Sequence, residues 1–199
     1  MPRPTSSTSL RSAFVAVAAL LVAGPAVAHA EAPSPKSKAI VPLVSIGGVK
    51  LGASYADALR VWGPGSDCAD EDADAAATSI PVDRTTYLGS CTWRDTSKES
   101  KGPALGSAEL FFKDGKVRRI SLSPEQNAKY FPTSKGPIGK YKVKGTTIGM
   151  GSSIATVMKK LRTRATGSGV EVAKGGKYLG FASSGGHVAG ISLGFLGDS

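Results

Sequence analysis

Few residues of this sequence could carry out catalysis. Histidine, the most frequent general base, occurs twice, as His29 and His187, and His187 directly follows a glycine turn, where a solvent-facing side chain is the usual outcome. Because serine is abundant, a Ser-His-Asp arrangement is formally possible, and so are paired carboxylates for glycoside cleavage. The glycine-rich segments lack the phosphate-binding G-x-x-x-x-G-K pattern. We assign no catalytic residue and expect no cofactor.

A group of acidic residues surrounds the first cysteine. Its members are Asp67, Asp70, Glu71, Asp72 and Asp74. The alternating spacing of three of them is similar to a calcium loop, but that loop needs Gly at its sixth position and Glu at its twelfth. The chain has Ala75 and Pro81 at these positions. We therefore interpret the group as a solvated loop and predict no metal site.

The two cysteines, Cys68 and Cys91, are the only ones in the chain. A redox or metal pair is the alternative to a disulfide, but the separation is unlike C-x-x-C and no second Cys or His cluster lies nearby. In an oxidising compartment an even pair usually forms a disulfide. We therefore predict a Cys68–Cys91 disulfide, which would constrain the unfolded chain by about 3 kcal/mol.

Positive charge is concentrated in the C-terminal part of the chain. From Glu31 to Phe112 there are 8 Lys and Arg against 11 Asp and Glu, and from Lys113 to Ser199 there are 15 against 4. The candidate residues for binding an anionic partner are Lys140, Lys142, Lys144, Lys159, Lys160, Arg162 and Arg164. The first three would share one face of an extended strand, and the other four lie at the C-terminal end of a predicted helix.

Such a basic surface would suit an acidic protein, an envelope polymer or phospholipid headgroups. Two structural explanations compete with that interpretation. Lysines protect an exposed strand edge from aggregation, and cations at the C-terminal end of a helix complement its dipole. No nucleic-acid-binding motif occurs, so we do not expect a nucleic acid partner.

The elements that position these residues are expected to follow an export signal. Arg3 and Arg11 precede an apolar run, 13–23, and Ala28-His29-Ala30 provides a cleavage site, which together are typical of a secretory signal peptide at residues 1–30. The run is too short to span a bilayer, and no later segment is long enough. We predict a secreted, soluble, extracytoplasmic monomer that begins with a flexible tether at residues 31–45.

The remainder of the chain contains one pattern twice. Gly52 and Gly151 each permit a turn, and Ser54 and Ser153 each stand where a helix cap accepts a hydrogen bond from the first free amides. Apolar residues then recur at helical spacing. The first set is Tyr55, Ala58, Leu59 and Trp62, and the second set is Ile154, Val157, Met158 and Leu161.

Each predicted helix is followed by strands. The strands 107–113 and 116–122 flank Asp114-Gly115, a strong hairpin signal, and 177–183 and 187–193 flank Ser184-Gly185-Gly186. Further strands are expected near 85–94 and 169–173. We predict an α+β fold of two tandem repeats, 46–125 and 126–199, each a short helix packed on an antiparallel β-meander.

Each repeat is expected to have its own core. The first core would contain Tyr55, Leu59, Trp62, Leu110, Phe112 and Ile120. The second would contain Ile154, Val157, Met158, Leu161, Phe181, Ile191 and Leu193. Each large side chain would contribute about 1.5 to 3 kcal/mol on burial.

These motifs resemble a known family. They are Leu51-Gly52-Ala53-Ser54, Trp62-Gly63-Pro64, Cys68, Cys91, Phe112-Lys113-Asp114-Gly115 and Gly151-Ser152-Ser153. The chain resembles the secreted β-lactamase inhibitory proteins of actinomycetes and, more distantly, the small lipoprotein of the outer-membrane barrel-assembly machinery. The resemblance implies helices on one face of an antiparallel sheet. The second repeat lacks the disulfide found in each repeat of the inhibitors, and no contact residue can be carried over.

We therefore expect a secreted, non-enzymatic binding module, such as an inhibitor of or an adaptor to an extracellular protein. Two alternatives belong to other classes of protein function. One is a small secreted hydrolase, and the other is a cell-envelope protein that binds an anionic polymer through its basic C-terminal half.

Overall fold

The structure of the chain is a computed structural model that describes residues 35–63, 67–70, 88–94, 106–123, 138–167 and 169–197. The predicted signal peptide, residues 1–30, lies outside the described residues, as do Glu71, Asp72 and Asp74 of the acidic group. No helix of the described part is long and apolar enough to cross a membrane.

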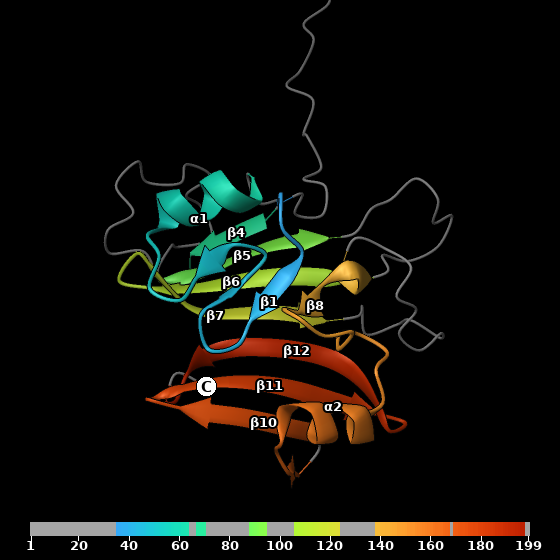
Figure 1. Cartoon of the computed structure of the whole chain (residues 1–199). Helices are drawn as coiled ribbons and strands as arrows, with labels where there is room; N and C mark the ends of the chain where they lie inside the picture. Colours follow the sequence, from blue (N-terminus) through green and yellow to red (C-terminus); the bar gives the residue numbers. More distant parts are fainter. Residues whose placement is uncertain are drawn as a thin grey trace, which may run out of the picture.

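The main element is an antiparallel sheet of eight strands (Figure 1). In spatial order these are β4 (Asp67–Asp70), β5 (Gly89–Arg94), β6 (Ser107–Lys113), β7 (Lys116–Ser123), β12 (His187–Phe195), β11 (Lys177–Ser184), β10 (Gly169–Lys174) and β9 (Ala165–Thr166). Each half of this order is a four-stranded meander, and the two meanders meet where β7 pairs with β12.

Both predicted helices are present, as α1 (Tyr55–Trp62) and α2 (Ile154–Leu161). Each begins at the predicted serine cap: the Asp57 amide donates to Ser54 Oγ at 3.1 Å, and the Thr156 amide donates to Ser153 Oγ at 3.2 Å. These bonds satisfy amides that have no partner inside the helix.

The two predicted hairpins are also confirmed, as β6–β7 and β11–β12. Both turns have two residues in the left-handed region, Asp114-Gly115 and Gly185-Gly186, which matches the twist of the flanking strands. Both hairpins also shift register at equivalent places, after Phe111 and after Ala182.

The same set of hydrogen bonds attaches each helix start to its hairpin turn. In the first half, the Gly52 amide donates to Val117 O at 2.8 Å and the Tyr55 amide to Gly115 O at 2.9 Å. In the second half, the Gly151 amide donates to Val188 O at 2.9 Å and the Ile154 amide to Gly186 O at 2.9 Å. The two segments therefore have the same local conformation.

A smaller sheet contains β3 (Val49–Lys50), β2 (Ser45–Ile46), β1 (Ala39–Val41) and β8 (Lys142–Val143), in that order. It corrects the prediction of a flexible tether over residues 31–45, because Ile40 is fully buried and β1 pairs on both sides. The apolar residues from Ala39 onward are therefore part of the fold. Since β3 belongs to the first predicted repeat and β8 to the second, this sheet also joins the two predicted repeats.

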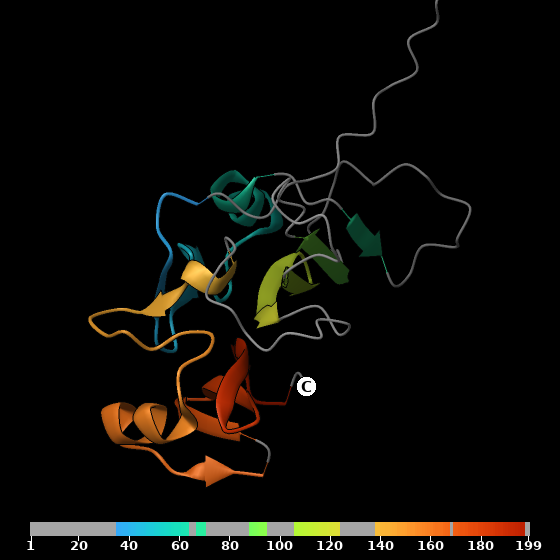
Figure 2. The same ribbon diagram turned by 90° about the vertical axis from the view of Figure 1, so that its right-hand side faces the viewer.

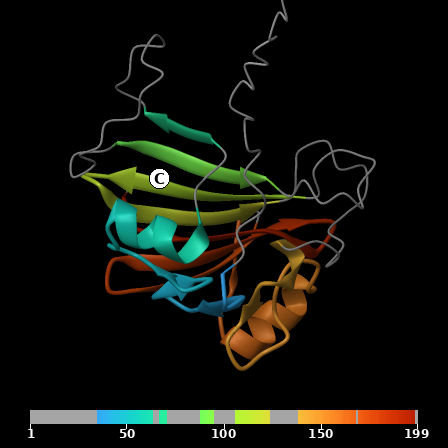
Figure 3. The ribbon, with the colours of Figure 1, turned by 90° about the horizontal axis from the view of Figure 1, so that it is seen from above.

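The helices and the smaller sheet all lie on one face of the large sheet (Figures 2 and 3). None of the described helices or strands covers the opposite face, which we call the open face. The described elements are thus arranged in two layers, with the apolar contacts between them.

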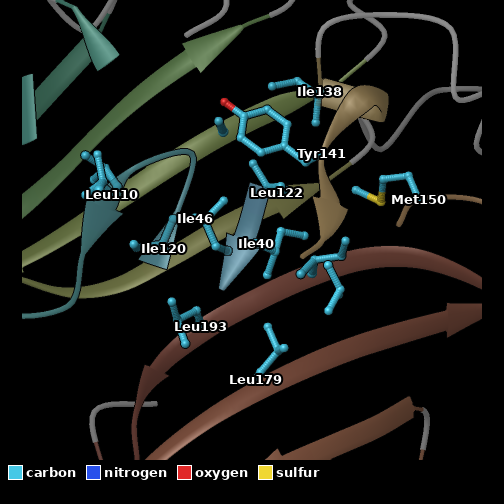
Figure 4. Packing of buried hydrophobic residues seen from close by; sticks show 14 of the residues in the cluster. Ile40, Ile46, Leu110, Ile120, Leu122, Ile138, Tyr141, Met150, Leu179 and Leu193 are labelled. Carbon is cyan, nitrogen blue, oxygen red and sulfur yellow. The ribbon is translucent and has the colours of Figure 1, made fainter. Parts of the chain in front are cut away.

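The prediction of two separate cores is wrong, because the buried side chains form one cluster (Figure 4). Leu110, Ile120, Leu193 and Leu179 are successive cross-strand partners, so the cluster continues across the β7–β12 junction. Five predicted core residues, Tyr55, Leu59, Ile154, Met158 and Leu161, are only partly buried against the cluster. A sheet shared by both halves leaves no boundary between two cores.

Candidate functional site

The open face is formed by the side chains that alternate with the buried ones along each strand. One row across this face contains Thr92, Glu109, Ser121, Ser192, Gly180 and Glu171, which are successive cross-strand partners. The next row contains Ser90, Phe111, Arg119, Gly194, Tyr178 and Ala173. The open face therefore crosses both meanders without interruption.

The centre of the open face carries small residues. Ser121 and Ser192 lie opposite each other, with Gly180 next to Ser192. The Tyr178 ring lies across Gly194, since a Cβ at that glycine would be 2.8 Å from Tyr178 Cε1. Together these residues make a platform on which another backbone could approach the sheet closely.

Aromatic and cationic groups border this platform. The Arg119 guanidinium lies over the Phe111 ring, 5.4 Å from its centroid. Phe195 and Lys177 come one residue beyond the open-face pair of Gly194 and Tyr178 and alternate to the covered side, where Arg118 and Lys177 lie 4.3 Å and 5.7 Å from the centroid of the Phe195 ring. Aromatic and Arg side chains are enriched at protein interfaces, where they contribute much of the binding free energy.

The predicted disulfide is confirmed: Cys68 and Cys91 are bonded and face each other across β4 and β5. Cys91 is fully buried on the covered face. The Tyr55 hydroxyl donates to Cys68 Sγ at 3.6 Å, so the start of α1 packs on the bridge. The disulfide thus has a structural position, away from the open face.

The seven predicted anion-binding residues fall into two groups. Lys140 ends a short 3-10 helix, η1 (Ile138–Lys140), and only Lys142 of the first group lies in a strand. The prediction of three lysines on one extended strand is therefore wrong. A Cβ at Gly149 would be 2.8 Å from Lys142 Nζ, so the Lys142 side chain lies along that glycine.

The second group lies at the end of α2, a helix that packs against β10. Lys159, Lys160, Arg162 and Arg164 are all exposed. Among the described residues, none of the seven cations of the two groups forms an ion pair.

The residues considered for catalysis are not brought together. His187 is exposed at the start of β12, and its Nδ1 lies 3.0 Å from Gly185 O in its own turn. Sequence reasoning missed Gly190-Ile191-Ser192-Leu193-Gly194, which has the letters of a nucleophile elbow. This segment is strand throughout, whereas an elbow requires a strand-to-helix turn. Within the described residues there is also no group of three or more metal-binding side chains.

Comparisons with known proteins leave the family of this chain open. No family model matches the sequence, and no curated protein matches it. A solved structure of an extracellular protein containing an SCP domain, from Bacillus anthracis str. Ames, aligns at 11% identity with a TM-score of 0.36. The alignment covers 73% of this chain and 44% of that one, so the chain spans less than half of the structure it matches.

Proposed function

We propose that the chain is an exported, non-enzymatic binding module that docks a partner protein on the open face. The observation that supports this proposal is the placement of all described helices and the smaller sheet on the other face. The open face belongs to one continuous hydrogen-bonded sheet, and a preformed binding surface reduces the entropy that is lost on association.

The proposed partner places a carboxylate opposite Arg119. The Arg119 guanidinium lies over the Phe111 ring, which favours one orientation of its donors for bidentate binding of a carboxylate. The excess of Lys and Arg over Asp and Glu from residue 31 onward, 23 against 15, would also favour approach of an acidic protein.

We also propose that the two halves are tandem copies of one helix-plus-meander unit. The matched hydrogen bonds at the two helix starts, the matched turns and the matched register shifts support this proposal. It agrees with the resemblance to the β-lactamase inhibitory proteins, which suggests an inhibitor as one form of the binding role. Fold alone does not set that role.

The test is affinity capture with a matched pair of variants. The mature chain, with Ser192→Arg and Ala155→Arg variants, would be immobilised and exposed to culture fluid of the producing organism. Ala155 is exposed on α2, away from the open face, so its variant controls for the added charge. We expect wild type and Ala155→Arg to retain the same stoichiometric partner and Ser192→Arg to lose it. Equal retention by both variants would overturn the proposal.

The second candidate function is binding of an anionic envelope polymer by the end of α2. It is favoured by four exposed cations within six residues, Lys159 to Arg164. The test is retention on an anionic matrix at low salt. A variant neutralised at Lys159, Lys160 and Arg164 should elute at lower salt than one neutralised at Lys140, Lys142 and Lys144, and equal elution would remove the α2 group from consideration.

The alternative function, a small hydrolase, can be tested by an activity assay. It would require turnover in a panel of hydrolase substrates, abolished by His187→Ala or Ser192→Ala. The exposed position of His187 and the strand conformation around Ser192 give no support to this alternative.

A further inference from the structure

One end of the large sheet carries two pairs of lysines. Two hairpin turns lie at this end, where β12 finishes (Figure 1): Asp114-Gly115 joins β6 to β7, and Gly175-Gly176 joins β10 to β11. Each turn is flanked by two lysines that are direct cross-strand partners, Lys113 with Lys116 and Lys174 with Lys177. The two halves of the chain therefore place the same like-charge pair at the same end of the sheet.

These pairs oppose stability, because like charges directly opposite each other on antiparallel strands repel. Within the part of the chain that the structure describes, none of the four lysines forms an ion pair. The Asp57 carboxylate accepts a hydrogen bond from Ser54, which bridges to the first turn, but this carboxylate is already paired with Arg60.

The two structural explanations of a lysine-rich surface do not apply to this end of the sheet. Lys113, Lys116 and Lys177 lie on strands that have a neighbouring strand on both sides, so they protect no exposed edge. None of the four lysines belongs to the last turn of a helix. Local rules of stability are broken most often at functional sites, so the lysine pairs point to a role in binding.

Positive charge continues between the two turns. Arg118 on β7 and Lys177 on β11 both lie over the Phe195 ring, so this ring links the two hairpins. The segments 113–119, 174–178 and 194–197 contain six Lys and Arg and one carboxylate, that of Asp114. We call this surface the basic end, and it consists of Lys113, Lys116, Arg118, Lys174 and Lys177. Its charge attracts an anionic partner.

An exposed apolar side chain lies at the basic end. Leu196 is 53% exposed, more than any other large apolar side chain of the described residues. Its amide donates to Gly176 O in the second turn at 2.8 Å. A hydrophilic polyanion offers no apolar surface to this side chain, whereas a bilayer has hydrocarbon beneath its anionic headgroups. The combination of cations with an exposed leucine therefore favours a lipid surface.

We propose that the basic end binds the surface of a bilayer that contains anionic phospholipids. The lysines of the two turns contact phosphate groups, and Leu196 enters the headgroup region. The chain meets the bilayer with the end of its sheet, so the open face stays accessible to a partner protein. This interaction is independent of protein docking on the open face.

The test is cosedimentation of the mature chain with vesicles. One kind of vesicle contains phosphatidylglycerol and phosphatidylcholine in equal amounts, and the other contains phosphatidylcholine alone. We expect binding to the first kind, weakened by added salt, and no binding to the second. Each basic residue near an anionic surface strengthens binding about fivefold. The double variant Lys116→Gln/Lys174→Gln should therefore lose about twentyfold in affinity.

A matched variant controls for the net charge. Lys159→Gln/Lys160→Gln removes the same charge from two exposed residues of α2, a helix that begins at the β11–β12 turn, at the other end of the sheet. It should bind the vesicles like wild type. Equal losses in the two double variants would show that only the total charge matters and would overturn the proposal, as would binding of wild type to neither kind of vesicle.

Further variants control for folding and for the kind of partner. Lys116→Gln/Lys174→Gln relieves the repulsion within each pair, so at low salt it should unfold at a higher urea concentration than wild type. Leu196→Ser keeps the charge but should lose about fivefold in vesicle binding, because about half of that side chain is still exposed. Equal vesicle binding by Leu196→Ser and wild type, together with binding of soluble polyphosphate, would assign the basic end to a hydrophilic polyanion and overturn the proposal.

Discussion

Ser121 of β7 lies directly opposite Ser192 of β12, in the middle of the eight-stranded sheet. The flanking pairs are Ile120 with Leu193 and Leu122 with Ile191. This register is symmetric, because the two hairpins place Ile120 and Ile191 at equivalent positions, and likewise Leu122 and Leu193. Such a contact has the form of an isologous interface, here within a single chain. It accounts for the continuous open face and for the single core.

Truncation of either isoleucine should destabilise the whole described fold. Ile120→Ala and Ile191→Ala should each lower the free energy of unfolding by about 2 to 5 kcal/mol, since both side chains are buried. Both tryptophans lie in the first half, so their fluorescence reports on that half, while far-UV circular dichroism reports on both. In urea titrations of Ile191→Ala the two signals should shift together. An unchanged fluorescence transition would show that the halves unfold separately.

The two serine caps should have equal importance. Ser54→Ala and Ser153→Ala each remove one hydrogen bond to a helix amide and should each cost about 1 kcal/mol of stability. Ser54→Asp and Ser153→Asp keep an acceptor and serve as controls. Urea unfolding measures the stability of all four variants. A cost at only one of the two serines would contradict the equivalence of the helix starts.

Local signals in the sequence were sufficient to predict the helices and the hairpins. A serine cap or a pair of left-handed turn residues acts over a few positions, so Ser153 and Gly185-Gly186 can be interpreted from their neighbours alone. The short strand β1 carries no such signal. Its partner β8 is about 100 residues away, and its pairing depends on burial of Ile40 between the layers.

The formation of the candidate functional site depends even more on contacts between residues far apart in the sequence. The open face follows from the β7–β12 pairing, and strand alternation in the sequence does not specify which strand edge pairs with which. On the covered side, Trp62 and Tyr141 come from different halves of the chain and both lie against Gly47. The sequence shows only that Trp62 lies on the apolar face of a helix.

The Tyr141 hydroxyl should be a source of alkaline instability. Burial raises the pKa of Tyr141 above its ordinary value of about 10. Above pH 10 the unfolded chain therefore loses this proton while the folded chain keeps it, and stability falls by up to about 1.4 kcal/mol per pH unit. In urea unfolding, the stability of Tyr141→Phe should fall less steeply than that of wild type between pH 10 and 11.5. At pH 8 it should be more stable by about 1 kcal/mol, because an unpartnered hydroxyl is removed. The same alkaline slope in both proteins would contradict this assignment.

Arg162 occupies a backbone conformation that favours glycine. It ends α2 with φ 52° and ψ 45°, in the left-handed region. Arg162→Gly should therefore raise the free energy of unfolding by about 1 kcal/mol. Arg164→Gly serves as the control, because it removes the same charge at a residue whose φ is not positive. It should not raise the free energy of unfolding. Thermal or urea unfolding distinguishes the two variants, and equal effects would show that the backbone of Arg162 is not strained.

The central claim is that the open face binds a protein, and the most direct measurement is calorimetric titration of the captured partner with three proteins. Wild type and Ala155→Arg should bind it with one-to-one stoichiometry and the same affinity. Ser192→Arg should lose at least about a hundredfold in affinity, because a long charged side chain at the centre of the platform prevents close contact. Equal affinity of Ser192→Arg and wild type would contradict the account.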